Sequence, residues 1–507
     1  MGRNRPHCSF EKNKNAMKNI LTLMLSFLCL LSWAQGQEPG VKTTDKTYRT
    51  SEGLEIAGQE GYLTVLENRN NPKSRLITVK FIRLRSLAAS PTEPVVFLEG
   101  GGSTVTWQAE SPKDLHDWVP VLKVADLIFI DQRGNGKQDL NYIEMGGFPA
   151  DFFNTEHAAL DHYQKMIKSA LPYFAKNNID YLGYTIEAHA EDLRDITRAL
   201  NIDRFNLIGF SFGSSIGMAT MMLYPEVVER AVLVGADAPH QSLNFPAHLD
   251  AHIEKISRMV KADKELSQQI PSFKRLVEST LDQLEKKPLE VNVRNPLNGQ
   301  ELSVKLGRFG LALLLRLDID DANDIPVMPR LVYDVSRGDT RLLSWFLQKR
   351  LPYALAIPAN GLNQGIASGV SDSRWKEIEH QAEVSPYGHL VNFPFDMALD
   401  HWPEIPMKLN TAQPIRTSIP TLFVTGDLDA RTPVVQVEET RKGFTHASHV
   451  IVKNAGHEQT LWNAKVFDEL IPAFLKGETV NDQTVSSRAI RFIPLTGDSE
   501  AHPAFQK

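Results

Sequence analysis

The sequence predicts an α/β fold, with a mostly parallel central sheet flanked by helices and a mostly helical cap inserted after the sixth strand. Short apolar runs alternate with helical stretches between Gly61 and Pro239, which is typical of a parallel sheet covered by helices. The alternation stops over residues 241–415, which read as mostly helical, and it resumes at Pro420. A single domain interrupted by a cap accounts for both changes of pattern.

Short apolar runs indicate where the strands lie. Pro94–Leu98 and Ala125–Ile130 are almost continuously apolar, as expected of strands that are buried on both faces. After the cap, Leu461–Leu475 has the pattern of a closing helix, and Ala489–Leu495 can add an edge strand. The predicted strands are Gly61–Leu66, Leu76–Leu84, Pro94–Leu98, Ala125–Ile130, Phe205–Gly209, Arg230–Val234, Pro420–Thr425 and Ala447–Val452.

The chain therefore divides into five segments. A length of 507 residues exceeds what one small core needs, which is consistent with a large insertion. The segments are a signal peptide (1–34), the N-terminal part of the core (35–240), the cap (241–415), the C-terminal part of the core (416–480) and a polar tail (481–507).

The N-terminal segment has the features of a signal peptide. Lys14 and Lys18 precede the apolar run Ile20–Leu31, and Ser32–Ala34 offers a small–x–small cleavage site. The run is short for a helix that spans a bilayer. We therefore expect export to the periplasm or the medium, with no stable membrane anchor after cleavage. Met17 is an alternative start, because the segment that follows it already reads as a complete signal peptide.

Both cysteines of the chain, Cys8 and Cys29, lie within this segment. After cleavage the protein would have none, which excludes a disulfide framework, a cysteine nucleophile and a thiolate zinc site. A lipid anchor at Cys29 is not expected, because Ser26–Leu28 lacks the small residues that precede a lipidated cysteine.

The charge of the chain argues against a nucleic acid partner. It has 55 Lys and Arg against 61 Asp and Glu, a net charge of −6, and the segment expected to be removed is itself basic. An acidic protein is repelled by phosphate backbones. We expect the partner to be a small peptide or ester substrate.

A glycine-flanked serine lies between a predicted strand and a predicted helix. Gly209–Gly213 reads Gly-Phe-Ser-Phe-Gly, after the strand Phe205–Gly209 and at the start of the helix Ser211–Tyr224. A serine held on so sharp a turn needs glycine two residues to either side, because larger side chains would collide with the backbone. Ser211 is therefore the predicted nucleophile of a hydrolase.

His457 and Asp429 are the predicted base and acid. A serine hydroxyl is a weak nucleophile that needs a base, and the base needs a carboxylate to orient it. His457 follows the last predicted strand of the core, and Asp429 lies just beyond the strand that ends at Thr425. Asp427 and Asp237 are alternatives for the acid, since each also follows a strand. The order serine, acid, histidine agrees with hydrolases that carry such a serine turn.

A glycine-rich loop after the third predicted strand is the candidate oxyanion loop. Leu98–Ser103 reads Leu-Glu-Gly-Gly-Gly-Ser, without the Lys-Ser/Thr pair of a P-loop or the spacing of a dinucleotide-binding fingerprint. A tetrahedral oxyanion needs two backbone N–H donors, which we assign to Gly101 in this loop and to Phe212 after the nucleophile. No metal or organic cofactor is implied.

Together these residues resemble the prolyl aminopeptidase and tripeptidyl aminopeptidase branch of the α/β hydrolases. The most distinctive element is Asp131–Gly136, Asp-Gln-Arg-Gly-Asn-Gly, which is similar to the D-Q-R-G-x-G loop that follows the fourth strand in that branch. The resemblance covers residues 60–240 and 415–475. In the cap, Arg337–Asp339 and Asp400–Pro403 are fainter matches to the tripeptidyl subgroup.

The resemblance implies the α/β-hydrolase fold. It also implies an oxyanion loop, a nucleophile, an acid and a base at Gly101, Ser211, Asp429 and His457. Glu99 and Gly102 stand where prolyl aminopeptidases usually have His and Pro, so a preference for proline is not implied.

We therefore expect an exported serine aminopeptidase that releases N-terminal residues or short peptides through an acyl-enzyme. Such an enzyme must also neutralise the terminal ammonium of its substrate, which requires a carboxylate near the site. A carboxylesterase for small acyl esters is the main alternative, because it would use the same triad. A binding protein that has lost catalysis is less consistent with a complete set of nucleophile, acid, base and glycine loop. The acids that could hold the ammonium are Asp318, Asp320, Asp321 and Asp324 in the cap and Glu99 in the glycine loop.

Overall fold

The computed structural model describes residues 39–101, 103–135, 140, 142–143, 148–295, 298–357, 359–395 and 401–497. The predicted signal peptide (1–34), Gly102, Gly136, Asp400 and residues 498–507 of the predicted tail lie outside these ranges. Within them, no helix is both long enough and apolar enough to cross a membrane.

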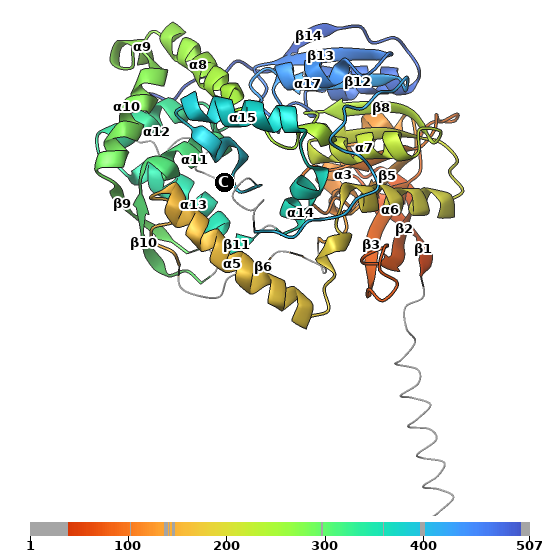
Figure 1. The fold of residues 1–507 in the computed structure, drawn as a ribbon. Helices are drawn as coiled ribbons and strands as arrows, with labels where there is room; N and C mark the ends of the chain where they lie inside the picture. The colour runs from red at the N-terminus through yellow and green to blue at the C-terminus, as the bar shows by residue number, and fades with distance from the viewer. Residues whose placement is uncertain are drawn as a thin grey trace, which may run out of the picture. The chain divides into compact units, whose positions relative to one another are not determined.

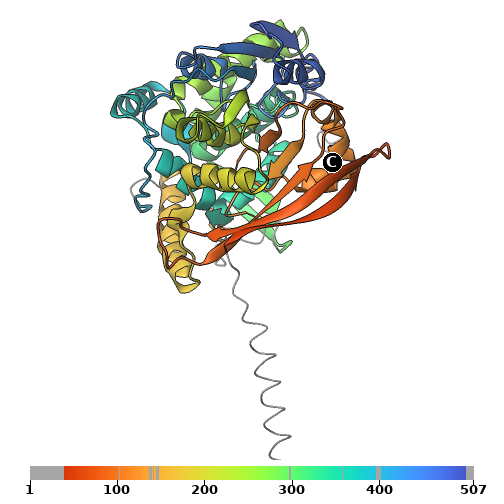
Figure 2. The same cartoon turned by 90° about the vertical axis from the view of Figure 1, so that its right-hand side faces the viewer.

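A ten-stranded sheet forms the core, with the order β1-β2-β3-β5-β4-β7-β8-β12-β13-β14 (Figure 1). β3 pairs antiparallel with β2 and β5, and the long strands β2 and β3 run along one side of the sheet in red and orange (Figure 2). From β5 to β14 every pair is parallel, which confirms the mostly parallel sheet. The strands are β1 Gly40–Arg49, β2 Glu55–Leu66, β3 Leu76–Leu84, β4 Val95–Leu98, β5 Leu127–Ile130, β7 Phe205–Phe210, β8 Val228–Val234, β12 Thr421–Gly426, β13 Ala447–Lys453 and β14 Gln483–Ser486.

Helices cover both faces of this sheet. Neighbouring residues of a strand point to opposite faces, so the clusters in which they pack identify the two faces. In β4, Phe97 packs in one cluster with Trp118 and Phe467, whereas Val96 packs in a second cluster with Leu193. The first face is covered by α2 (Trp107–Glu110), α3 (Pro112–Asp117), α4 (Val119–Leu122), η5 (Lys465–Leu470) and α18 (Ile471–Leu475), and the second by α6 (Ile186–Ala199), α7 (Phe212–Leu223) and α17 (Val434–Arg441).

The two edges of the sheet differ from the prediction. β1 is exposed along almost its whole length, so no apolar run in the sequence indicates it. Because β1 belongs to this sheet, the insertion follows its seventh strand in chain order rather than the sixth. At the other edge, β14 forms at Gln483–Ser486, and the predicted strand Ala489–Leu495 is wrong. Ile490, Phe492 and Leu495 instead pack against the hydrophobic cluster of the insertion, where their apolar side chains are removed from water.

The insertion between β8 and β12 is mostly helical and has its own hydrophobic cluster. α5 (Glu156–Lys176) precedes it in the chain, within the segment predicted as core, yet packs with it beside α13 (Figure 1). The hydroxyl of Tyr163 on α5 donates to the carbonyl of Tyr353 at 3.0 Å. The elements of the insertion are η3 Pro239–Gln241, α8 Pro246–Ala262, α9 Leu266–Gln269, α10 Phe273–Lys286, β9 Leu289–Arg294, β10 Glu301–Leu306, α11 Arg308–Asp318, α12 Met328–Ser336, α13 Arg341–Leu355, β11 Ala356–Ile357, α14 Ala359–Ser368, α15 Asp372–Val384 and η4 Gly388–Asn392.

Candidate active site

Ser211 lies on the turn between β7 and α7, with φ of 51° and ψ of −125°. A positive φ is unfavourable for a residue with a side chain, so the surrounding packing must hold the turn. A Cβ at Gly209 would lie 2.7 Å from the carbonyl oxygen of Gly213, and a Cβ at Gly213 would lie 1.9 Å from that of Leu98. The two glycines are therefore required for α7 to start directly against β4 and β7.

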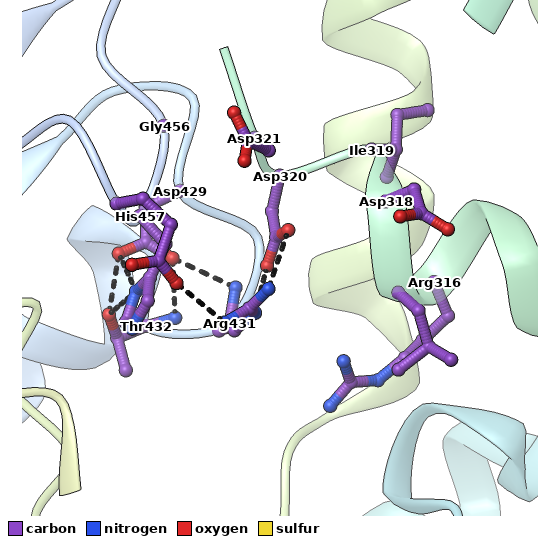
Figure 3. A network of polar contacts seen from close by, with 12 residues as sticks. Arg316, Asp318, Ile319, Asp320, Asp321, Asp429, Arg431, Thr432, Gly456 and His457 are labelled. Atoms are coloured by element: carbon purple, nitrogen blue, oxygen red, sulfur yellow. Dashed lines mark hydrogen bonds and ion pairs between the residues drawn. The ribbon is translucent and has the colours of Figure 1, made fainter. Parts of the chain in front are cut away.

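The structure brings Ser211, His457 and Asp429 together. His457 Nε2 lies 2.8 Å from Ser211 Oγ, and His457 Nδ1 lies 2.7 Å from Asp429 Oδ2. With Nδ1 protonated, His457 donates to the carboxylate, and its Nε2 accepts the serine proton. The acid is itself held by the Thr432 hydroxyl at 2.6 Å and by the backbone N–H groups of Thr432 and Arg431 at 2.8 and 2.9 Å (Figure 3).

The electrostatics of this pair favour a charged acid beside a basic imidazole. Burial alone would raise the pKa of Asp429, but the charge of His457 and the hydrogen bonds from His457 and Thr432 lower it to about 2. Burial alone would lower the pKa of His457, but the charge and the hydrogen bond of Asp429 raise it above its ordinary value. Each partner thus stabilises the ionised form of the other.

The alternative acids lie elsewhere. Asp427 Oδ2 pairs with Lys255 Nζ at 2.9 Å, and Asp427 Oδ1 accepts from the backbone N–H of Asn454 at 2.6 Å. Asp237 follows β8, and its backbone N–H donates to Ser214 Oγ at 2.8 Å. Neither carboxylate forms a hydrogen bond or an ion pair with the imidazole of His457, so Asp429 occupies the position of the acid.

The glycine loop lies directly against the nucleophile. A Cβ at Gly100 would be 2.8 Å from that of Ser211. Gly101, with φ of 54°, and Phe212, the first residue of α7, line the same cavity. The first N–H groups of a helix have no acceptor within the helix, so the N–H of Phe212 can bind an oxyanion. The structure thus places both predicted oxyanion residues beside the serine.

Two residues of the Asp-Gln-Arg-Gly motif hold this loop in place. Asp131 accepts hydrogen bonds from the backbone N–H groups of Val105 and Thr106 at 2.6 and 2.8 Å. Gln132 Nε2 donates to the carbonyl oxygen of Glu99 at 2.6 Å. In the sequence the motif is apparent only as a family resemblance, because the contact between the two loops is not visible there.

A cavity of about 560 Å³ opens above the site, between the sheet and the insertion. This volume is typical of a small-molecule site. Within the described residues, no group of three or more His, Cys, Asp and Glu side chains is placed to hold a metal ion. The lining of the cavity includes Gly101, Phe212 and Asp237 from the core, Arg316, Arg350, Tyr353 and Phe393 from the insertion, and Arg431 from the loop after β12.

The acids expected to hold a substrate ammonium do not line this cavity. Asp318 pairs with Arg350 at 2.5 Å and with Lys349 at 2.9 Å, and Asp320 pairs with Arg431 at 2.6 Å. Asp324 also pairs with Lys349, at 2.6 Å, and Asp321 Oδ1 accepts from Gln459 Nε2 at 2.8 Å. Glu99 accepts from Gln108 Nε2 at 3.1 Å and lines a different cavity beside Trp107 and Trp462. The expectation for these five acids is therefore not met.

Asp237 is the acid that does line the cavity, among the residues that the structure describes. Its carboxylate accepts no hydrogen bond and joins no ion pair within that part of the chain. Burial raises its pKa to about 7. From the sequence Asp237 is predicted only as an alternative triad acid, because its distance from the cap cannot be read from the sequence.

The chain belongs to the α/β hydrolase family: residues 93–464 match the family described as alpha/beta hydrolase fold. This membership makes the protein a hydrolase by class. The match is to the family as a whole, so the aminopeptidase branch stays a prediction.

Known relatives cover only part of the chain. It is 27% identical over 93 residues to Rv2715 of Mycobacterium tuberculosis and likewise to Mb2734 of Mycobacterium bovis, both named as uncharacterized proteins. The matched segment is 18% of this chain and 27% of each relative, so it spans about a quarter of their length.

Similar solved structures match this chain at low identity and low TM-score. Rv0554 of Mycobacterium tuberculosis has 15% identity and a TM-score of 0.37, over 83% of this chain and 100% of that one. An esterase of Thermogutta terrifontis has 12% identity and a TM-score of 0.35, over 86% and 98%.

Proposed function

We propose that this protein is a serine hydrolase in which Ser211, His457 and Asp429 act as nucleophile, base and acid. His457 Nε2 takes the proton of Ser211 Oγ as Oγ bonds to the substrate carbonyl carbon, and the oxyanion accepts hydrogen bonds from the N–H groups of Gly101 and Phe212. His457 then gives that proton to the leaving amine or alkoxide, and an acyl-enzyme remains. Water repeats the two steps, which releases the carboxylic acid and restores the serine.

The observation that carries this proposal is the continuous chain of contacts from acid to nucleophile. The distances of 2.7 Å from Asp429 Oδ2 to His457 Nδ1 and 2.8 Å from His457 Nε2 to Ser211 Oγ are those of hydrogen bonds. The strained φ of Ser211 is a second support, because strain of this kind is concentrated at functional sites.

Labelling with a fluorophosphonate tests the nucleophile. The wild type is expected to be labelled, and Ser211→Ala is not. Ser242→Ala is the matched control, because Ser242 lines the same cavity but its hydroxyl donates to the backbone carbonyl of Gly369 at 2.8 Å rather than to a histidine. Labelling that persists in Ser211→Ala, or that disappears in Ser242→Ala, would show that the nucleophile is misassigned.

For the substrate, we propose a short peptide with a free N-terminus, so that the enzyme acts as an aminopeptidase. Asp237 supports this, because it is an unpaired, desolvated carboxyl group in the cavity that Gly101 and Phe212 line. A substrate ammonium at this position would restore a charge partner to the carboxylate, which burial otherwise disfavours.

The amine site is tested by the ratio of kcat/KM for an aminoacyl amide to that for its N-acetylated form. The wild type is expected to prefer the free amine by about tenfold or more, and Asp237→Asn to bring the ratio close to one. Asp321→Asn is the control, because Asp321 is a cap acid outside this cavity. An unchanged ratio in Asp237→Asn would remove the amine site from the proposal.

A carboxylesterase for small acyl esters is the second candidate. The aromatic side chains of Phe212, Tyr353 and Phe393 line the cavity and favour an apolar acyl group. The same kinetic panel separates the two functions. If p-nitrophenyl esters are cleaved with higher kcat/KM than any aminoacyl or tripeptidyl amide, the esterase is the better description.

We also propose that the enzyme acts outside the cytoplasm, since residues 1–34 have the pattern of a signal peptide. Expression of the full chain in a Gram-negative host, followed by fractionation and N-terminal sequencing, tests this. A processed protein in the periplasm or the medium, beginning near Gln35, is expected. An uncleaved protein in the cytoplasm would contradict export.

A further inference from the structure

The cavity above Ser211 has three arginines in its lining, and two of them are already neutralised. Arg350 binds Asp318 through both Nε and Nη2, at 3.1 and 2.5 Å. Arg431 pairs with Asp320 at 2.6 Å and with Glu458 at 3.1 Å. The first pair lies within the insertion and the second joins the insertion to the core, and neither group leaves a net positive charge for a ligand.

Arg316 is the exception. It lies on α11, and its Nε donates to the backbone carbonyl of Val391 at 2.9 Å. No carboxylate of the described residues lies within ion-pair distance of it, and its guanidinium points away from Asp318 (Figure 3). It lines the cavity on the side of the insertion.

A buried arginine without an ion-pair partner destabilises the protein unless a ligand pairs with it. Burial lowers the pKa of Arg316; the charge of Asp320 opposes this shift, and the positive charges of Arg431 and Arg350 add to it. An arginine nevertheless remains charged at any physiological pH, so the cavity contains a cation that forms no ion pair with any described residue. A buried charge is stabilised when an opposite charge with hydrogen-bonding oxygens pairs with it.

We propose that Arg316 binds a carboxylate of the substrate, so that the preferred substrates are short peptides that carry both a free N-terminus and a carboxylate. This inference rests on the proposed hydrolase function and names its substrate class more narrowly. A guanidinium matches the planar carboxylate through two parallel hydrogen bonds, whereas neutral esters and peptide amides offer no charge to it.

Asp237 and Arg316 both line the cavity, but no ion pair joins them. The charged groups that act on the Asp237 carboxyl are His457, Arg374 and Asp429, and Arg316 is not among them. The two unpaired charges therefore do not neutralise each other. A ligand with an ammonium at one end and a carboxylate at a distance from it would compensate both, which a simple acyl ester cannot do.

Three peptides distinguish the possible sources of the carboxylate: Ala-Ala-Ala as the free acid, Ala-Ala-Ala amide and Ala-Glu-Ala amide. We expect kcat/KM of the wild type to be about 10- to 100-fold higher for a carboxylate-bearing peptide than for Ala-Ala-Ala amide. A preference for the free acid assigns the C-terminal carboxylate, and a preference for Ala-Glu-Ala amide assigns an acidic side chain. No preference for either peptide would overturn the inference.

Arg316→Gln is expected to bring this ratio close to one, and Arg316→Lys to restore part of it. Arg308→Gln is the matched control, since Arg308 lies on the same helix but pairs with Asp282 outside the cavity, and it should keep the wild-type ratio. A ratio that is unchanged in Arg316→Gln, or lost equally in Arg308→Gln, would also overturn the inference.

Binding to Ser211→Ala separates this inference from the proposed function. Calorimetric dissociation constants for the three peptides, in Ser211→Ala and in the double variant with Arg316→Gln, report the carboxylate site without turnover. If Ser211→Ala still hydrolyses peptides, the proposed nucleophile fails while the carboxylate preference can persist. If both variants bind all three peptides equally, the carboxylate site fails whatever the nucleophile is.

Discussion

The backbone N–H of His457 donates a hydrogen bond to the backbone carbonyl oxygen of Asp320, 2.9 Å away. Asp320 belongs to the insertion, whereas His457 follows β13 of the core. The adjacent Gly456 packs at the same contact, where a Cβ would lie 2.2 Å from that oxygen. The side chain of Asp320 binds Arg431 on the loop that carries the acid. The insertion therefore positions both the base and the acid, in addition to covering the cavity.

Gly456→Ala is expected to displace His457 and to lower kcat by about 100-fold, because the added methyl group collides with the backbone of Asp320 and a shift of about 1 Å is enough for such a loss. Steady-state kinetics with the best substrate, together with circular dichroism, checks this. Gly217→Ala on α7 is the control, since its nearest contact would be an ordinary 3.7 Å. Full activity of Gly456→Ala would show that the contact is not needed.

The acid limb of the pH profile is expected to lie above pH 6.5. His457 must be neutral to accept the serine proton, and Asp429 raises its pKa above the ordinary value of 6.5, so kcat/KM falls as the pH drops through this raised pKa. The measurement uses a neutral ester, so that a substrate amine does not contribute.

The same measurement on Asp429→Asn tests the cause of this shift. Without the carboxylate the limb moves to lower pH, and kcat falls by about 10⁴-fold. Asp427→Asn should leave the limb in place, because Asp427 pairs with Lys255 rather than with the imidazole. A wild-type midpoint below pH 6.5 would contradict the raised pKa.

Asp131→Ala is expected to lower kcat by about tenfold or more, with a smaller change in KM. The substitution removes the acceptor of the hydrogen bonds from the backbone N–H groups of Val105 and Thr106, so the glycine loop loses its support. The upper limit on the loss of kcat is the effect of losing one oxyanion donor, which is about 10²- to 10³-fold. Asp114→Ala, on α3, is the control. If kcat is unchanged, the loop does not depend on Asp131.

Arg133→Ala is expected to reduce the free energy of unfolding by up to about 3–5 kcal/mol, because it breaks a buried ion pair with Asp192, which then keeps only Arg69 as its partner. Arg133 binds Asp192 through Nε and Nη2 at 2.6 and 2.5 Å, and its Nη1 also donates to the carbonyl oxygen of Glu67 at 2.7 Å. Chemical denaturation measures the change. Arg204→Ala, which breaks an exposed pair with Glu229, should cost about 0–1 kcal/mol. Equal effects of the two variants would contradict a structural role for Arg133.

The sequence by itself determined the fold class and pointed to three residues that the structure brings together. Buried strands such as Val95–Leu98 are apolar along their whole length, and the serine turn needs glycine at Gly209 and Gly213, so both leave local signals. The edge strands β1 and β14 have mostly exposed side chains and leave no such signal.

Only the tertiary structure decided which charges are free. Asp318, Asp320 and Asp324 could all have faced a substrate as far as the sequence showed, but folding pairs each with an arginine or lysine. Asp237 and Arg316 remain unpaired at the cavity, although nothing in their sequence neighbourhood distinguishes them. The physical reason is that an ion pair forms only within a few ångströms. Which charges come that close depends on how the insertion packs against the core, and local sequence patterns do not encode that packing.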